Sequence, residues 1–291
     1  MTTQRITIVG ATSGPGKSLL LKLDRLGYPV TGIGRDPEKI EQIRRILKGS
    51  KAAIQAIDVS KDQTFLESTD ILVHCSRPDL VHNLLSENLS RFIALGSTRK
   101  FTHFPDQRCR DVETMERLVI SSSIPATVLH PTLIYGADGF SNIERIIGIA
   151  RKCPVIPLPR GGMSLIQPIH CDDVSAALMR CLDNDRVINQ SIVIAGPSPM
   201  TYRTFVQTTL AAMNLSARVI SMPCSLVKAL AGITRYLPGV PLIKSDEVQR
   251  LLEDKNFDTH QMQNLLSVIP RSYDTGIRQY ADKLGGCPGT D

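Results

Sequence analysis

The segment Val9–Ser18, VGATSGPGKS, carries the first pattern in the chain that could do chemistry. Its last eight residues, ATSGPGKS, fit the loose form of the nucleoside-triphosphate P-loop, with Ala in place of the first Gly. Gly10, Gly14 and Gly16 also fit a glycine spacing of dinucleotide-binding folds. Both interpretations place a phosphate at the first turn of a helix, where unpaired N–H groups and the helix dipole favour an anion. The segment therefore predicts a phosphate site of one of two kinds.

The rest of the chain favours a dinucleotide over ATP. A P-loop enzyme needs an acidic residue at the end of an apolar strand to hold magnesium, and the strands expected at Ile71–Cys75 and Arg91–Gly96 end without one. A dinucleotide loop follows the first strand, as this one does, and uses its glycines for a tight turn, close approach to pyrophosphate and helix packing. Lys17 is then a helix-surface residue or a secondary phosphate contact.

The end of the second expected strand, VTGIGRDPEK, bears on the choice of cofactor. An acidic residue there accepts from the ribose 2′-hydroxyl of NAD, whereas an Arg accommodates the 2′-phosphate of NADP. Arg35 stands at this point and favours NADP(H), because a guanidinium binds phosphate bidentately. In the alternative, Asp36 only caps the next helix, Arg35 is merely exposed, and NAD(H) is the cofactor. The loop, strand ends and topology together give these cofactor-binding candidates: Gly10, Thr12, Ser13, Gly14, Pro15, Gly16, Arg35, Asp58, Val59, Cys75, Ser76 and Arg77.

Short apolar runs alternate with helical patterns through the first half of the chain, which predicts a doubly wound parallel α/β sheet of the Rossmann type. The second half is turn-rich and then mostly helical, which predicts a smaller C-terminal substrate domain. The expected division is a dinucleotide-binding domain over 1–135 with 166–195 returning to it, and a cap over 136–165 and 196–291. Expected strands lie at Arg5–Val9, Pro29–Gly34, Ala52–Ile57, Ile71–Cys75, Arg91–Gly96, Ala126–His130, Ile166–His170 and Ser191–Ala195, and expected helices at Gly16–Leu26, Pro37–Leu47, Asp79–Ser86, Asp111–Ser121, Ile143–Arg151 and Asp173–Leu182.

Composition sets broad limits on the function. The 291 residues are 42% hydrophobic and 21% charged, with a net charge of +6. Trp is absent and aromatic residues make up 4%, which weakens a nucleic-acid interpretation based on base stacking. Seven cysteines without a C-x-x-C pair predict reduced thiols and no metal site. With no signal sequence or membrane-spanning run apparent, we expect a cytoplasmic protein with a small-molecule substrate, and a homo-oligomer stays open.

Several long segments, taken in order, resemble the extended and atypical short-chain dehydrogenases/reductases. ITIVGATSGPG is similar to the family's first strand and glycine loop, and RFIALGST to its fifth strand, with Ser97 at the catalytic serine position. HPTLIYGADGFSNI, LIQPIHCDDV, IAGPSPMTYRTFV and EDKNFDTHQMQNLLSVIPRSYDTGI resemble the substrate-domain segments. The nearest group is the epimerase-like proteins classed with the NADPH-binding accessory subunit of complex I. The resemblance adds the cofactor-binding candidates Gly96, His130, Pro131 and Thr132, and the substrate-pocket candidates Tyr135, Asn142, Gln167 and His170.

One family feature is missing. Members use Tyr-x-x-x-Lys after the fifth strand, but the corresponding positions fall near Arg108 and Val112, and no Tyr lies between Ser97 and Val119. An Arg cannot serve as a neutral proton relay. We therefore expect either an atypical oxidoreductase or epimerase-like enzyme, with Ser97, Lys100 and His103 as catalytic candidates, or an NADP(H)-binding protein without turnover that is structural, assembles with others or senses redox state. The segments that resemble the substrate domain favour the enzyme.

Two further segments could be mistaken for functional sites. The run His170-Cys171-Asp172-Asp173 resembles a metal cluster, but neighbouring strand residues point to opposite faces. We expect Asp172 or Asp173 to cap the helix that follows, with His170 free to face a substrate. The Pro- and Gly-rich segment Cys153–Gly162 predicts a shaped loop that lines the pocket rather than a polyproline ligand.

Overall fold

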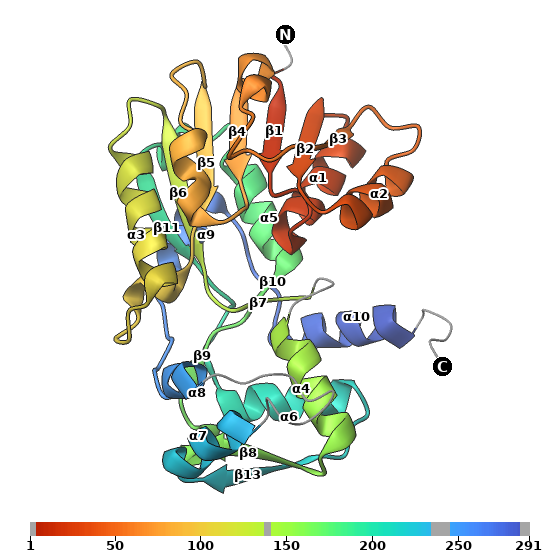
Figure 1. Cartoon of the computed structure of the whole chain (residues 1–291), viewed down its shortest axis with the longest axis vertical. Coiled ribbons are helices and arrows are strands. Elements are labelled where there is room, and N and C mark those ends of the chain that lie inside the picture. The colour runs from red at the N-terminus through yellow and green to blue at the C-terminus, as the bar shows by residue number, and fades with distance from the viewer. Residues whose placement is uncertain (1–3, 137–140, 234–244, 286–291) are drawn as a thin grey trace.

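A seven-stranded, all-parallel sheet forms the upper half of the molecule (Figure 1). The computed structural model describes residues 4–136, 141–233 and 245–285. The strand order is β11-β6-β5-β4-β1-β2-β3, so the winding direction reverses between β1 and β4, where doubly wound sheets bind their ligands. The Rossmann-type sheet expected from the sequence is confirmed. Its strands are β1 (Ile6–Val9), β2 (Val30–Gly34), β3 (Ala53–Ala56), β4 (Ile71–His74), β5 (Arg91–Leu95), β6 (Ala126–Pro131) and β11 (Gln190–Ile194).

Alternate side chains along the strands pack into two hydrophobic cores, one on each face of the sheet. Ile71 and Val73 point into the core under α1, α2, α5 and α9, whereas Leu72 points into the core under α3 and the 3₁₀ turns. Both faces are therefore covered, as a parallel sheet requires. The covering elements are α1 (Gly14–Arg25), α2 (Pro37–Ile46), α5 (Cys171–Arg180) and α9 (His260–Leu266) on one face, and η1 (Thr64–Ser68), η2 (Pro78–Asn83) and α3 (Gln107–Ile120) on the other.

A smaller, mixed layer lies below the carboxyl ends of the strands (Figure 1). Its core is built around Phe205, Tyr135 and Tyr273; the ring of Tyr273 meets that of Tyr135 edge-on at 4.8 Å and lies tilted against that of Phe205 at 4.7 Å. The division of the chain into two domains stays a prediction, and residues near Met262 return to the core of the large sheet. The elements of this layer and its connections are β7 (Ile134–Tyr135), α4 (Ser141–Lys152), β8 (Val155–Pro159), β9 (Leu165–Ile166), β10 (Ile169–His170), β12 (Met200–Thr201), α6 (Tyr202–Ala212), β13 (Arg218–Met222), α7 (Cys224–Ile233), α8 (Ser245–Arg250) and α10 (Tyr273–Gly285); short 3₁₀ turns complete the chain at η3 (Thr98–Phe101), η4 (Arg160–Gly162) and η5 (Asp185–Val187).

The segment Cys153–Gly162 was expected to be a shaped loop, and that expectation is wrong. Residues Val155–Pro159 form β8, which pairs in parallel with β13, a strand that the sequence analysis missed. Two prolines are tolerated in β8 because β8 has a neighbouring strand on one side only. The missing N–H of a proline can face the unpaired side, where it removes no hydrogen bond between strands. The strand expected at Ile166–His170 is likewise divided into β9 and β10, which pair with different partners.

The cap of α5 was also assigned to the wrong residue. His170, rather than Asp172 or Asp173, stands at the N-cap, and its Nδ1 accepts from the backbone N–H of Asp172 at 3.1 Å. The two aspartates lie in the first turn, where carboxylates favour the positive end of the helix dipole. By contrast, the expected cap of α2 is correct, since Asp36 accepts from the N–H groups of Glu38 and Lys39.

Candidate functional site: a groove at the carboxyl ends of β1, β2 and β4

The glycine segment makes a tight turn between β1 and α1. Gly10 has φ +83°, and a Cβ there would lie 2.6 Å from the backbone carbonyl of Cys75 at the end of β4. A Cβ on Gly16 would lie 2.3 Å from the carbonyl oxygen of Gly10. Ser13 caps α1 by accepting from the N–H of Gly16 at 3.2 Å. Only glycine fits at these two positions, so the turn brings the first helical N–H groups close to the switch point of the sheet.

The same geometry argues against a P-loop. In a P-loop the backbone up to the G-K-S triplet wraps the phosphate, but here α1 begins at Gly14. The N–H of Lys17 already donates to the carbonyl of Ser13 at 2.8 Å, and Ser18 donates from Oγ to Asp172 at 2.7 Å. The backbone of the triplet is therefore built into the helix and does not cradle a ligand.

An open groove runs from the glycine turn across the ends of β1, β2 and β4. The predicted cofactor residues that line it come from four separate loops, which follow β1, β2, β3 and β4, and they meet at one place. They are Gly10, Thr12, Ser13, Arg35, Val59, Cys75, Ser76 and Arg77. Apolar walls come from Ile33, Ile57 and Leu80. A groove with a basic end, apolar walls and a glycine turn offers the kinds of groups that hold the phosphates and the adenine of a dinucleotide.

Arg35 and Lys39 give the β2 end of the groove its positive charge. Both side chains are exposed, and both residues line the groove beside Thr12. A Cβ on Gly34 would lie 2.6 Å from the methyl group of Thr12, so the bare glycine leaves room for the turn to pack against β2. The nearby carboxylate of Asp36 is held by the N–H groups of α2. This end of the groove therefore presents cations to a ligand.

The remaining predicted cofactor residues lie around the groove rather than along its wall. Asp58 turns its carboxylate to the N–H and Oγ of Ser60, and these hydrogen bonds hold its pKa below the usual value. Gly14, Pro15 and Gly16 form the first turn of α1. Gly96, His130, Pro131 and Thr132 lie at the ends of β5 and β6, where Thr98 donates to the carbonyl of Pro131. Their contact with a cofactor stays a prediction.

A buried polar chain occupies the ends of β5, β6 and β11. The backbone N–H of Ser97 donates to Nδ1 of His130, so the ring proton lies on Nε2, which donates to Oγ of Ser191 at 3.1 Å. Ser191 donates in turn to Glu116 at 2.5 Å, and Lys100 donates to both oxygens of Glu116 at 2.6 Å. Burial lowers the pKa of His130 to about 4, so the ring is neutral near pH 7. Every member of the chain already has a partner within the protein.

The two positions at which the family carries Tyr and Lys hold residues that cannot relay a proton. Arg108, at the expected Tyr position, is exposed, and Val112, at the Lys position, is buried under α3. His103 is exposed, and its backbone N–H donates to Glu253 at 2.6 Å. Glu253 also accepts from Thr102, so the loop after β5 is fixed by the C-terminal segment. Ser97, the third catalytic candidate, is half-buried just beyond the carboxyl end of β5.

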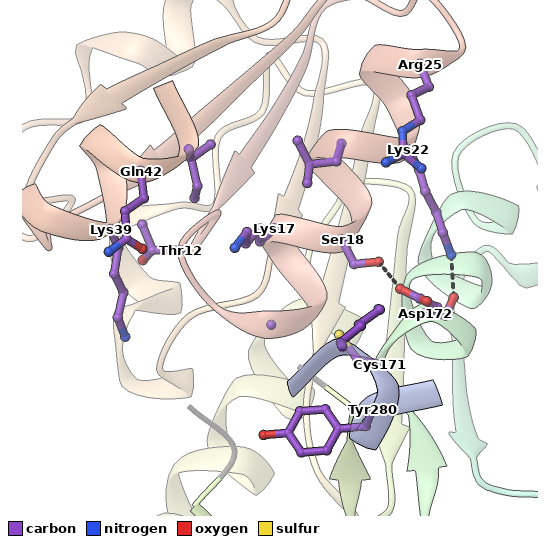
Figure 2. A pocket seen from close by; sticks show the side chains of 15 residues that line it. Thr12, Lys17, Ser18, Lys22, Arg25, Lys39, Gln42, Cys171, Asp172 and Tyr280 are labelled. Carbon is purple, nitrogen blue, oxygen red and sulfur yellow. Dashed lines mark hydrogen bonds between the residues drawn. The ribbon is translucent and has the colours of Figure 1, made fainter. Parts of the chain in front are cut away.

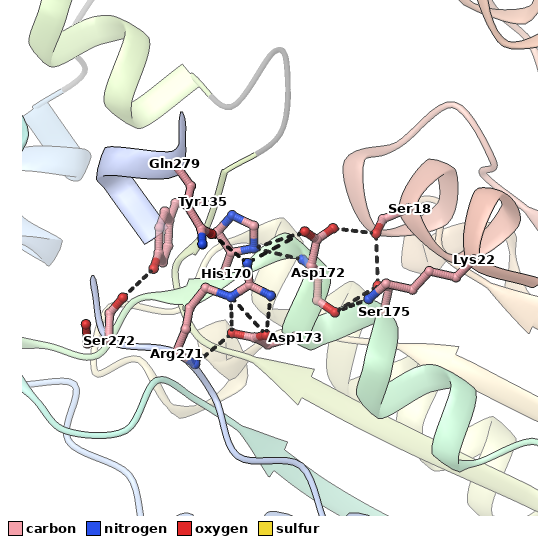
Figure 3. Close-up of polar contacts among 10 residues, drawn as sticks. All are labelled: Ser18, Lys22, Tyr135, His170, Asp172, Asp173, Ser175, Arg271, Ser272 and Gln279. Atoms are coloured by element: carbon pink, nitrogen blue, oxygen red, sulfur yellow. Dashed lines mark hydrogen bonds and ion pairs between the residues drawn. The ribbon is translucent and has the colours of Figure 1, made fainter. Parts of the chain in front are cut away.

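The predicted substrate-pocket residues are mostly engaged inside the protein (Figure 3). Tyr135 is 1% exposed and donates from its hydroxyl to the carbonyl of Ser272 at 3.3 Å. Gln167 donates to Gly196 and accepts from the N–H of Phe257. His170 packs edge-on against Tyr135 and caps α5. Asn142, by contrast, is exposed on α4. Binding of a substrate by these four residues stays a prediction.

Sequence reasoning missed several residues at the site. Lys39 lies four residues beyond Arg35, in the first turn of α2, and a basic residue at that spacing is a signal that could have been used. Glu116 and Ser191 carry no such signal, because they meet Lys100 only through tertiary packing. Across the described ranges no group of three or more potential metal ligands comes together, and no helix is long and apolar enough to cross a membrane.

Sequence comparisons identify distant relatives over most of the chain. The 40 kDa subunit of mitochondrial NADH-ubiquinone oxidoreductase from Neurospora crassa is 21% identical, over 87% of this chain and 72% of that protein. The mitochondrial NADH dehydrogenase [ubiquinone] 1 alpha subcomplex subunit 9 from Arabidopsis thaliana is 20% identical, over 85% and 69%. No family model matches the chain.

Solved structures with similar folds include sugar-nucleotide enzymes. UDP-glucuronic acid 4-epimerase from Bacillus cereus, in complex with NAD, superposes with a TM-score of 0.73, at 16% identity and covering 96% of this chain and 99% of that one. dTDP-glucose 4,6-dehydratase from Bacillus anthracis, also with NAD, gives 0.73 at 10% identity, covering 98% and 97%. The resemblance inferred from the sequence is thus confirmed: the chain has the Rossmann fold of the NAD-dependent epimerases and dehydratases and is a distant relative of the 40 kDa and alpha-9 subunits of complex I.

Proposed function

We propose that this protein binds NADP(H) in the groove and holds it without turnover. The observation that carries the proposal is the contrast between the two ends of the site. The adenosine end offers Arg35 and Lys39 to a phosphate, whereas at the other end Lys100 is fixed on Glu116 and the Tyr position holds an exposed Arg108.

The preference for NADP(H) over NAD(H) rests on charge at the end of β2. The only carboxylate in the groove lining of the described residues is that of Asp36, which accepts from two backbone N–H groups of α2 and lies 3.9 Å from Nζ of Lys39. A ribose 2′-phosphate would meet a guanidinium and an ammonium group, which suits an anion better than a 2′-hydroxyl. The fold neighbours above contain NAD, so NAD(H) is the alternative that the experiment must test.

The experiment is calorimetric titration of the purified protein with NADPH and NADH. We expect NADPH to bind more tightly. Arg35→Ala should weaken NADPH about tenfold or more, as loss of a charged hydrogen-bond partner does, and should leave NADH within about twofold. Arg45→Ala is the matched control, because this exposed guanidinium lies on α2, the helix that follows Arg35, and does not line the groove. Equal affinity for both cofactors in the wild type would refute the preference, and absence of heat with either would refute the cofactor site.

We further propose that the protein works within a larger assembly, as the names of its relatives indicate for them. A bound cofactor that is not turned over would then stabilise the fold, or its exchange between NADP⁺ and NADPH would report the redox state of the NADP(H) pool. Migration of the tagged chain with NADH-ubiquinone oxidoreductase on native gels would support this role. Migration only as a monomer or a homo-oligomer would contradict it.

The cellular compartment of the protein depends on whether it assembles with this mitochondrial complex. The six described cysteines are free thiols, which suits the cytoplasm expected from the sequence as well as the mitochondrial matrix. Imaging of a tagged chain distinguishes the two.

An atypical reductase or epimerase-like enzyme acting on a small substrate is the second candidate. Ser97 favours it, because its hydroxyl lies half-buried at the sheet edge beside the expected nicotinamide position. The same titrated samples should then be assayed for NADPH oxidation with a panel of carbonyl compounds and sugar nucleotides. Turnover that Ser97→Ala abolishes, and that Arg45→Ala leaves unchanged, would establish the enzyme and overturn the proposal of binding without turnover.

A further inference from the structure

A second pocket lies beside α1, between α2, α5 and α10, and basic side chains dominate its lining (Figure 2). Three elements contribute these side chains. Lys17, Lys22 and Arg25 come from α1, Lys39 from α2 and Lys283 from α10. Among the described lining residues the only carboxylate is Asp172. Lys39 lies 3.9 Å from the carboxylate of Asp36, which is outside this lining, so Lys22, Arg25 and Lys283 supply the positive charge in excess of Asp172.

The carboxylate of Asp172 does not cancel this excess. It accepts from Ser18 at 2.7 Å and lies 3.7 Å from the guanidinium of Arg271, which is outside the pocket lining (Figure 3). Lys22 donates from Nζ to the backbone carbonyl of Asp172 at 2.5 Å and to Oγ of Ser175 at 2.6 Å, and both acceptors are uncharged. Burial of this ammonium group lowers its pKa, as expected where solvation has been lost without a full counter-charge. An anion would supply that charge.

Neutral hydrogen-bonding groups complete the lining. Thr12 and Gln42 lie beside Lys39 in the lining of this pocket (Figure 2). Several ammonium groups together with hydroxyl and amide donors match the many acceptor oxygens of a phosphate. An isolated carboxylate ligand has fewer oxygens and half or less of the charge, so it would satisfy fewer of these groups.

We propose that this pocket is a second anion site, which binds a phosphate-bearing compound separately from the dinucleotide groove. The two sites touch, since Thr12 and Lys39 line both. They are otherwise formed by different residues, with Arg25 and Lys283 at the new site and Arg35 and Arg77 in the groove. A bound phosphate would bridge α1 of the sheet domain and α10 of the C-terminal region, so occupancy would stabilise the contact between these two parts of the chain.

The test is calorimetric titration with inorganic pyrophosphate, in the presence and absence of NADPH. We expect wild-type protein to bind pyrophosphate in both conditions. Lys283→Glu and Arg25→Glu should each weaken this binding about tenfold or more while leaving NADPH affinity within about twofold. Both side chains belong to exposed residues, so the variants should fold, which thermal unfolding checks. Lys48→Glu is the control, with the same change of charge at an exposed residue outside the pocket.

The outcomes separate this proposal from that of the cofactor groove. Pyrophosphate binding that NADPH abolishes, and that Lys283→Glu leaves unchanged, would place the anion in the groove and overturn the second site. Absence of pyrophosphate binding would overturn it as well, whatever NADPH does. Persistence of the lysine- and arginine-dependent binding without any NADPH affinity would support it even if the groove proposal failed.

A second arm identifies the source of the phosphate. Sedimentation with phosphatidylcholine vesicles, with and without phosphatidic acid, tests a lipid headgroup. Binding that requires phosphatidic acid, is displaced by pyrophosphate and is lost in Lys283→Glu would support the site with a lipid ligand. Pyrophosphate binding with no sedimentation would support it with a soluble phosphate compound.

Discussion

Lys100 donates from Nζ to both carboxylate oxygens of Glu116, each at 2.6 Å, and fixes the loop after β5 to the middle of α3. The side chains are 16% and 20% exposed, so water screens the pair only in part. Through Ser191 the same carboxylate reaches His130 and the end of β6. This contact therefore links the loop after β5 to α3, β6 and β11.

We expect Glu116→Ala to destabilise the protein by about 2–4 kcal/mol, because it leaves Lys100 and Ser191 without their shared acceptor. Lys100→Met should cost less, about 1–2 kcal/mol, because Ser191 keeps Glu116 as an acceptor. Urea denaturation of both single variants and of the double variant measures the coupling between the two residues. A coupling energy near zero would contradict the buried ion pair.

Stability should fall on mild acidification because three buried histidines are neutral in the folded state. Burial lowers the pKa of His74, His130 and His170 to about 4 each. An unfolded histidine binds its proton near pH 6.5, so the unfolded state takes up more protons below that value. The contribution of each is complete above the unfolded pKa and is lost as pH falls towards about 4, at about 1.4 kcal/mol per pH unit.

His74→Leu isolates one of these groups. Its Nδ1 is buried and has no hydrogen-bond partner in the described part of the chain, whereas its Nε2 donates to the backbone carbonyl of Arg77 at 3.1 Å. The substitution removes one hydrogen bond and one unsatisfied nitrogen, so it should cost about 1 kcal/mol at neutral pH. The variant should lose less stability than the wild type between about pH 7 and about pH 5. Parallel slopes in urea unfolding across that range would show that His74 does not titrate as described.

Gly10→Ala should damage both the fold and the cofactor site. The new Cβ combines a positive φ of +83° with a contact of 2.6 Å to the backbone of Cys75. Gly27→Ala is the matched control, since Gly27 has φ +78° but no atom within 4 Å of the added Cβ. We expect about 1 kcal/mol for the control and about 3 kcal/mol or more for Gly10→Ala, with NADPH binding lost only in the latter. Equal losses in thermal unfolding would show that β4 yields to the new methyl group.

Glu253→Ala should release the loop after β5. Its carboxylate accepts from Thr102 at 2.8 Å and from the backbone N–H of His103 at 2.6 Å. Loss of these charged hydrogen bonds should cost about 1.5–3 kcal/mol and expose the loop to limited proteolysis. Glu87→Ala, at an exposed carboxylate, should change stability by about 0.5 kcal/mol or less. Wild-type resistance to proteolysis in Glu253→Ala would mean that other contacts fix the loop.

The sequence alone determined the sheet and the groove because the patterns that specify them are local. Apolar runs such as Ile71–Cys75 predict buried parallel strands, and the glycine spacing from Gly10 to Gly16 predicts the turn that closes over the strand ends. Asp36 and the residues after it likewise specify a helix cap within four positions. Every strand of the large sheet was expected at or near its observed place.

Only the tertiary structure decided which contacts the expected catalytic residues after β5 make. Lys100 looked available for chemistry until packing placed Glu116 against it, and Glu116 in turn meets Ser191, 75 residues away. His170 became a helix cap instead of a free ligand, and β8 found its partner in β13. Such contacts join residues with no shared local pattern and depend on which surfaces are buried together. The glycine turn can therefore be predicted from neighbouring residues, whereas the contacts of the expected catalytic residues depend on long-range packing.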